Sequence, residues 1–128
     1  MIAKKVRRKC INYAKASSHY CEKTLAEMCG IASHGIRLLC EDAGIEGIRV
    51  VEGFFIPKGQ KIKNSHNWCS YGNKFIDITA TQFGEKELIL CVSNKDKRYK
   101  MSEEPNICIH DLYTDEACEV VYKTGKRN

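Results

Sequence analysis

The 128-residue sequence lacks several features that would point to particular classes of protein. It has no apolar run close to the roughly 18 residues that a membrane span needs. Its first residues are charged, with no apolar segment of a secretory leader behind them. It has two prolines, no Pro-rich linker, no repeat and no low-complexity tract. These absences predict a single folded domain over residues 1–128 and no membrane partner.

Cysteine is plentiful, but its spacing does not favour a metal site. None of the eight cysteines forms a C-x2-C pair, whereas structural zinc sites use ligands paired at short spacing. Cys108 and His110 form a C-x-H pair, so a metal protein is kept as a weaker alternative. We expect no cofactor and a cytoplasmic location, or delivery into a host cytoplasm. In that reducing compartment most of the cysteines are expected to be thiols that fill the core.

The net charge of +5 comes partly from basic clusters at the two ends of the chain. Such clusters can attract nucleic acid or another anionic partner. No aromatic residues interleave with them in the way that nucleic-acid-binding surfaces require. We therefore interpret the clusters as solvated helix faces and chain ends, and we do not expect a nucleic-acid partner. Their members are Lys4, Lys5, Arg7, Arg8, Lys9, Lys123, Lys126 and Arg127.

The periodicity of apolar residues predicts helices first and strands afterwards. Residues 2–14 and a run from Cys29 to a stop at Gly44 have helical spacing, and Ser17 or Ser18 could cap a short helical turn over residues 22–27. The order predicts an α+β fold, with N-terminal helices packed on a mostly antiparallel sheet. The expected strands are residues 47–56, a hairpin over 66–79, residues 87–93 and, more weakly, 98–102 and 118–123.

The predicted hairpin brings together a histidine and a carboxylate. A two-residue turn at Gly72-Asn73 pairs Tyr71 with Lys74. With that register, His66 and Asp77 are diagonal neighbours on one face of the hairpin. A three-residue turn would shift the register by one and separate them. The two-residue turn therefore predicts a His–Asp pair able to accept and return a proton.

Cys29 is the candidate nucleophile for this pair. It stands at the start of a predicted helix, where the positive end of the helix dipole and a nearby imidazolium would favour a thiolate. Gly30 next to it would let a substrate or a backbone come close. Taken singly, Cys29 could be a buried thiol, His66 a hydrogen-bonded strand residue and Asp77 a turn residue. Their order in the chain, together with the position of His66 and Asp77 on one face of the hairpin, favours a Cys–His–Asp triad.

Three motifs carry a family resemblance: "MCGIAS" around Cys29, "HNW" at His66 to Trp68, and "FIDIT" at Phe75 to Thr79. In this order they resemble the transglutaminase-like branch of the papain-like cysteine hydrolases, over about residues 20–92. The resemblance implies a papain-like core with Cys29 as nucleophile, His66 as general base and acid, and Asp77 as the residue that orients His66. It also implies that Trp68 packs beside the site or forms a pocket wall. The chain has no acidic calcium loop and no length for flanking β-domains, which argues against calcium-dependent protein cross-linking.

The leading hypothesis is a cysteine hydrolase that cleaves an amide bond of a protein or peptide substrate, either in the backbone or in a glutamine side chain. The same triad could instead transfer the acyl group to an amine. A binding module with a vestigial site is the alternative class, with the basic N-terminal helix or the loop of residues 57–64 contacting a partner. Gln82 is the favoured second hydrogen-bond donor to the oxyanion that forms on the substrate carbonyl, with His19 and Asn67 as alternatives. His34 is taken as structural or solvated. The oligomeric state is not predicted.

Overall fold

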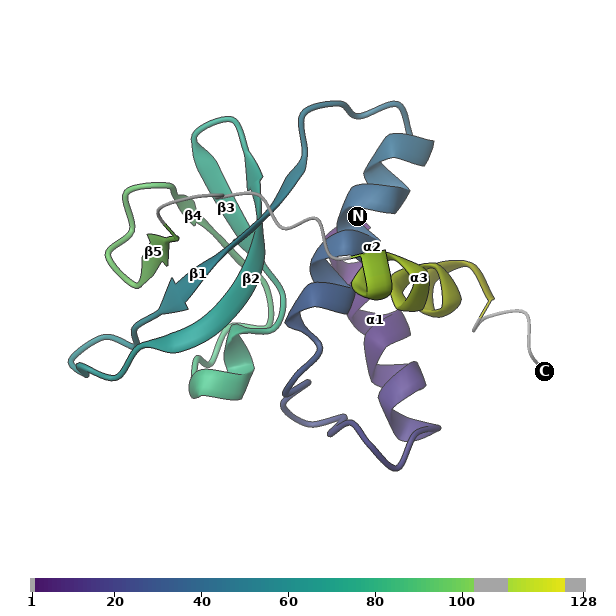
Figure 1. Ribbon diagram of the computed structural model, residues 1–128, viewed down its shortest axis with the longest axis horizontal. Helices are drawn as coiled ribbons and strands as arrows, with labels where there is room; N and C mark the ends of the chain where they lie inside the picture. Colours follow the sequence, from purple (N-terminus) through teal and green to yellow (C-terminus); the bar gives the residue numbers. More distant parts are fainter. Residues whose placement is uncertain (1, 103–110, 124–128) are drawn as a thin grey trace.

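The computed structural model describes residues 2–102 and 111–123, and within them the fold is α+β. Figure 1 shows the helices on one side and the strands on the other. In the described residues the sheet has five strands in the order β4-β3-β2-β1-β5, and each neighbouring pair is antiparallel. The elements are α1 (Ile2–Lys15), α2 (Cys29–Asp42), β1 (Arg49–Phe55), β2 (Asn64–Tyr71), β3 (Lys74–Asp77), the 3-10 turn η1 (Ala80–Phe83), β4 (Leu90–Ser93), β5 (Tyr99–Met101), α3 (Asp111–Cys118) and the π-helical turn η2 (Glu119–Lys123).

The sheet is strongly curled, so that residues of non-adjacent strands touch. The rings of Phe75 on β3 and Tyr99 on β5 lie 5.5 Å apart between centroids, although β2 and β1 separate these strands in the sheet. The ring of Trp68 on β2 contacts both of them. We call the cluster inside the curl the aromatic core. Its buried members are Val51, Phe55, Trp68, Phe75, Ala80, Leu90 and Tyr99.

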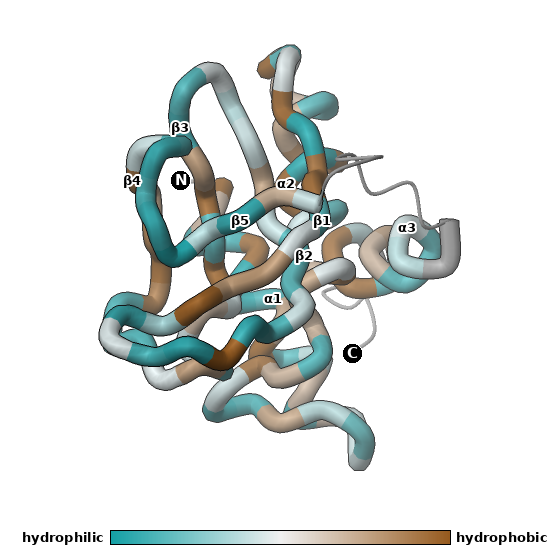
Figure 2. Tube along the Cα trace, turned by 60° about the vertical axis from the view of Figure 1, so that its left-hand side comes forward, coloured by the Kyte–Doolittle hydropathy of each residue, from teal (hydrophilic) through white to brown (hydrophobic). Residues whose placement is uncertain are grey.

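A second cluster, the helix-side core, fills the space between the helices and the other face of the sheet. On α1 the buried residues Val6, Cys10 and Ala14 recur every four positions, which places them on one face of the helix. In Figure 2 hydrophobic segments alternate with hydrophilic ones along the chain, and the β4–β5 connection is hydrophilic. The other buried members of the helix-side core are Ala3, Leu25, Met28, Ile31, Ala32, Ile36, Cys40, Val50, Cys69, Ile78, Ala117, Val120 and Val121.

Most element predictions are confirmed, including the helix at the N-terminus, the helix that begins at Cys29, and the strands up to residue 101. Two predictions are wrong. Residues 22–27 form turns rather than a helical turn, with positive φ at Leu25 and Glu27. Residues 118–123 are helical rather than a strand, because Val120 and Val121 both pack into the helix-side core. A short apolar run of this kind does not distinguish a strand from a buried helix.

Two expectations about side chains also need correction. Among the seven free cysteines in the described part of the chain, Cys10, Cys40 and Cys69 are buried, so fewer than half fill the core. Arg7 of the N-terminal basic cluster is buried rather than solvated, and its guanidinium donates to the Ile78 carbonyl next to Asp77. A buried cation needs such a partner, and this one ties α1 to the end of β3.

No helix within residues 2–102 and 111–123 combines the length and apolar character needed to cross a membrane.

Candidate active site

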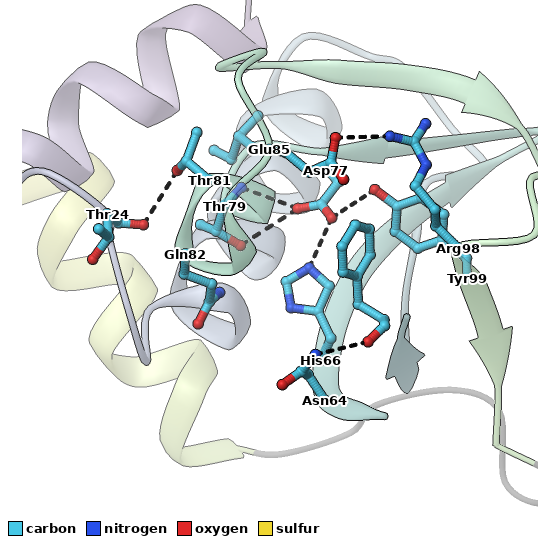
Figure 3. Close-up of polar contacts among 12 residues, drawn as sticks. Thr24, Asn64, His66, Asp77, Thr79, Thr81, Gln82, Glu85, Arg98 and Tyr99 are labelled. Carbon is cyan, nitrogen blue, oxygen red and sulfur yellow. Dashed lines mark hydrogen bonds and ion pairs between the residues drawn. The ribbon is translucent and has the colours of Figure 1, made fainter. Parts of the chain in front are cut away.

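The β2–β3 hairpin has the predicted register, and it brings His66 and Asp77 together. Tyr71 pairs with Lys74 and Cys69 with Ile76, so the turn is the two-residue Gly72-Asn73 turn. The His66 Nε2 and Asp77 Oδ2 atoms are 2.7 Å apart (Figure 3). Both side chains are almost completely buried, with 0% and 1% of their surface exposed. The juxtaposition expected from the turn is therefore confirmed.

Asp77 is held by more donors than His66 alone. Its Oδ1 accepts from the Thr79 backbone N–H at 3.0 Å and from the Thr79 hydroxyl at 3.4 Å. Its Oδ2 also accepts from the Tyr99 hydroxyl at 2.8 Å. Burial opposes ionisation of Asp77, but His66 and these donors hold the pKa of the carboxyl below its ordinary value. Asp77 is therefore an ionised acceptor, and the Nε2 atom of His66 must carry the proton that it donates.

His66 is a strong base in an apolar surrounding. Its ring lies 4.9 Å from the Phe83 ring and 5.9 Å from the rings of Phe55 and Trp68, measured between centroids. Burial alone would lower the pKa of His66, but the Asp77 carboxylate and the Cys29 side chain raise it to about 9. The imidazole is consequently protonated at neutral pH.

Tyr99 is a site residue that sequence reasoning missed. Burial and the Asp77 carboxylate raise the pKa of its phenol, so the hydroxyl stays a donor. Tyr99 lies on the edge strand β5, 22 positions from Asp77. The weak strand pattern at residues 98–102 gave no signal that this edge would curl back to β3. Trp68 has the expected place, since its buried ring packs between His66, Phe75 and Tyr99.

Cys29 is the first residue of α2, and its side chain lies next to His66. The preceding residue, Met28, makes no side-chain hydrogen bond to the start of the helix, so the N-cap side chain does not offset the partial positive charge of the first turn. Cys29 is half-buried, and its side chain is close enough to His66 to help raise the pKa of the imidazole. The Nδ1 atom of His66 is buried and has no partner at full hydrogen-bond geometry among the described residues. The structure therefore assembles Cys29, His66 and Asp77 in one place.

The segment before Cys29 is tied to the turn after Asp77. The Thr81 hydroxyl donates to the Thr24 carbonyl at 3.2 Å, and the Gln82 Oε1 atom accepts from the Glu27 N–H at 3.4 Å. Figure 3 shows the Thr81 side chain pointing toward Thr24. These bonds connect the strand that carries Asp77 to the loop that delivers Cys29. The Gln82 Oε1 atom is thus the acceptor of a loop contact, while its Nε2 donor is buried and has no partner among the described residues, so the role of Gln82 as an oxyanion donor stays a prediction.

Cys29 and His66 open into a pocket of about 590 Å³. Two of the three residues considered as oxyanion donors line it, namely His19 and Asn67, whereas Gln82 does not. Gly30 has the close neighbour that was expected, but the neighbour is a side chain: a Cβ atom there would lie 2.6 Å from the Tyr113 ring. The absence of a side chain at Gly30 lets α3 pack beside Cys29. The remaining lining residues are Tyr20, Glu27, Glu52, Gly53, Phe54, Ser65, Ser102, Tyr113 and Glu116.

The other candidates lie away from this pocket. His34 is buried on α2, where its Nδ1 atom accepts from Arg37 at 3.3 Å, so it is structural. The start of the 57–64 loop lines a separate pocket of about 560 Å³ with Asp96 and Arg98. Cys108 and His110 lie outside the described residues. Within the part of the chain that the structure describes, no three His, Cys, Asp or Glu side chains are grouped to hold a metal ion.

Comparisons of the chain with protein-family models, with curated proteins and with solved structures gave no match. A function for this protein must therefore be argued from the chemistry of its own residues. The available groups are a thiol at a helix N-terminus, an imidazole with a raised pKa, and an ionised carboxylate behind it. Groups of these kinds can form and break a covalent bond to a carbonyl carbon.

Proposed function

We propose that this protein is a thiol-dependent amide hydrolase with a transglutaminase-like, papain-like core. Cys29 is the nucleophile, His66 is the general acid and base, and Asp77 orients His66. One observation carries the proposal. The His66 ring uses Nε2 for the buried bond to Asp77 and lies against Cys29 at the head of α2, at the wall of a pocket.

In the first half of the reaction the Cys29 thiolate attacks the amide carbonyl carbon. A C–S bond forms, the C–N bond breaks, and the leaving amine takes a proton from the His66 imidazolium. The raised pKa of His66 supports this step, because the imidazole holds that proton at neutral pH. The backbone N–H groups of the first turn of α2, to which the N-cap residue Met28 makes no side-chain hydrogen bond, are suited to stabilise the negative charge on the carbonyl oxygen.

In the second half water hydrolyses the thioester. Neutral His66 accepts a proton from the water, the new C–O bond forms and the Cys29 sulfur leaves. Asp77 stabilises the imidazolium that results and keeps its ring in one orientation. Hydrolysis regenerates the thiolate–imidazolium pair. An amine in place of water would give acyl transfer by the same groups.

The substrate is a protein or peptide, and the amide is a backbone bond or a glutamine side chain. A pocket of about 590 Å³ is large enough for one or two amino-acid side chains and their backbone. The pocket is half-open rather than a closed cavity for a small metabolite, since its lining residues His19 and Glu27 have side chains 68% and 77% exposed. This openness favours a polymeric substrate that extends beyond the site.

The proposal is tested first by the rate at which iodoacetamide alkylates each cysteine at pH 6, followed by peptide mass spectrometry. Cys29 should react at least tenfold faster than the exposed residue Cys91, and His66→Ala should slow Cys29 alone. Cys10 and Cys69 should stay unreactive, because burial raises the pKa of both thiols. A Cys29 that reacts no faster than Cys91, or that is indifferent to His66→Ala, would overturn the proposal and leave the binding-module alternative.

Turnover is tested with a library of peptide amides analysed by mass spectrometry. The Cys29→Ala protein should lose at least a thousandfold in rate and keep its fold by circular dichroism. Cys91→Ala is the matched control, since Cys91 is exposed on the edge strand β4 and does not line the pocket. Hydrolysis by Cys29→Ala at the wild-type rate would contradict the assigned chemistry.

A further inference from the structure

The pocket at Cys29 has an acidic lining in a protein that is basic. The chain has 21 Lys and Arg residues against 16 Asp and Glu residues. Three glutamates nevertheless line this pocket, and among the described residues the lining contains no lysine and no arginine. The three are Glu27, Glu52 and Glu116. A random sample of this surface would contain more basic residues than acidic ones.

The three carboxylates reach the pocket from three separate elements. Glu27 belongs to the turn before α2, Glu52 to β1 and Glu116 to α3, which lies against α2 in Figure 1. The Glu116 Oε2 atom is fixed, since it accepts from the Tyr13 hydroxyl at 3.2 Å and the Tyr20 hydroxyl at 3.0 Å. The acidic lining is thus produced by the tertiary fold and not by one run of acidic sequence.

Neighbouring charges do not cancel the negative electrostatic field of the three glutamates. The charges of His66 and Asp77 offset each other, because the imidazolium and the carboxylate form a buried pair. His19 lies 3.9 Å from Glu27 through its Nε2 atom, but both side chains are largely exposed, so the pair is weak. Two lysines next to the lining residue Phe54 reduce the field from that side: Lys63, whose Nζ atom lies 5.8 Å from the centroid of the Phe54 ring, and Lys100, the cross-strand partner of Phe54 on β5. Neither of them lines the pocket.

The pocket also contains a group placed to meet a ligand. The His66 side chain is fully buried, yet its Nδ1 atom has no partner at full hydrogen-bond geometry within the described residues. Its neighbour in the site is the Cys29 thiol, which raises the pKa of the imidazole, and both residues line the pocket. The acidic side chains therefore surround a position that a substrate is expected to occupy.

We propose that Glu27, Glu52 and Glu116 make this site selective for cationic polypeptide segments, in which a lysine or arginine side chain lies next to the amide that Cys29 attacks. The inference rests on the proposed function for the identity of that amide. The selectivity itself depends only on the electrostatic field at Cys29. Carboxylates around a concave site raise the local concentration of a cation and lower that of an anion.

The test compares two thiol reagents of similar size and opposite charge. They are 2-(trimethylammonium)ethyl methanethiosulfonate and 2-sulfonatoethyl methanethiosulfonate. Each converts a thiolate to a mixed disulfide and releases methanesulfinate. Rates are measured at Cys29 by peptide mass spectrometry and divided by the rate at Cys91 in the same sample, which removes the difference in intrinsic reactivity.

The cationic reagent should be favoured at Cys29 by about tenfold at 0.05 M salt, and the preference should shrink as salt is raised to 1 M. Glu27→Gln combined with Glu52→Gln should abolish most of it. The matched control is Glu46→Gln combined with Glu87→Gln, which removes the same charge from exposed positions outside the pocket. An equal rate for the two reagents, or the same loss in the control, would overturn the proposal.

This outcome is independent of the outcome for the proposed function. Charge selectivity at Cys29 without hydrolysis of any peptide amide would remove the hydrolase proposal and keep a site that binds cationic segments. Hydrolysis without charge selectivity would keep the hydrolase and remove the cationic substrate. If both hold, peptides with lysine beside the scissile amide should be cleaved faster than the same peptides with glutamate.

Discussion

The two cores of this protein differ in how they are built, and each positions one half of the candidate site. The helix-side core is made of aliphatic residues, small residues and thiols, and it holds α2 and therefore Cys29. The aromatic core is made largely of rings in defined mutual orientations, and it holds His66 and Asp77. Aliphatic cores tolerate substitutions that conserve volume, whereas aromatic pairs depend on the mutual orientation of their rings.

The comparison indicates that the nucleophile and the base can be disturbed separately. The two halves pack on each other through Val50 and Cys69 of the sheet. Specific polar contacts also join them: the bonds of Thr81 and Gln82 to the loop before Cys29, the bond of Arg7 to Ile78, and the bond of the Cys69 thiol to the Ser33 carbonyl on α2. A change in one core should therefore alter the half of the site that it supports before it alters the other half.

The largest effect is expected from truncating the central ring of the aromatic core. Trp68→Ala should lower the free energy of unfolding by about 3–5 kcal/mol, against about 2–4 kcal/mol for Ile31→Ala in the helix-side core. Urea denaturation measures both, and Trp68→Phe replaces Trp68→Ala if that protein does not fold. An NMR titration of His66 should shift in the Trp68 variant and stay unchanged in Ile31→Ala. A His66 titration that shifts in Ile31→Ala and stays unchanged in the Trp68 variant would show that the aromatic core is not the part that supports His66.

The next effect is a dependence of stability on pH that belongs to the aromatic core. His66 has a folded-state pKa of about 9 against an ordinary value of 6.5, so its protonated form stabilises the fold. That stability is complete below about pH 6.5 and is lost as the pH rises through about 9, by about 3 kcal/mol in total. Asp77→Asn should remove this loss, because burial alone lowers the pKa of His66.

This pH dependence is measured as the difference between the unfolding free energies of wild type and Asp77→Asn from pH 6 to 10. Taking the difference cancels the titration of lysines and tyrosines elsewhere in the chain. Asp77 also contributes on the acid side, since its lowered pKa gives stability that is lost as the pH falls through that value. If the unfolding free energies of the two proteins run parallel above pH 6.5, then Asp77 does not raise the pKa of His66.

The smallest effect concerns the link between the two halves. Gln82→Ala removes the acceptor of the Glu27 N–H bond and should cost about 1 kcal/mol of stability. It should also slow alkylation of Cys29 several-fold while leaving the His66 titration unchanged, since the loop carries the nucleophile only. Gln60→Ala, an exposed substitution outside the Cys29 pocket, is the control. Unchanged alkylation of Cys29 would show that this contact does not position it.

Turn residues and apolar periodicity were enough to predict those parts of the fold that depend on residues close together in the sequence. The register of the β2–β3 hairpin followed from its turn, and the start of α2 at Cys29 followed from apolar periodicity. The helical state of residues 118–123 was not predictable from that short run, because burial against α1 and α2 decides it. The triad residues were predictable because two of them share one hairpin, while their catalytic role remains a proposal.

What the sequence by itself determined is most of the elements and the pairing of His66 with Asp77, since these depend on residues at most about a dozen positions apart. The tertiary structure alone decided that Tyr99 reaches Asp77, that Tyr113 packs on Gly30, and that acidic side chains collect around Cys29. The two ring contacts, and the places of Glu52 and Glu116 beside Cys29, join residues 22 or more positions apart. Only the curl of the sheet and the packing of α3 on α2 bring them together, and no local pattern encodes either.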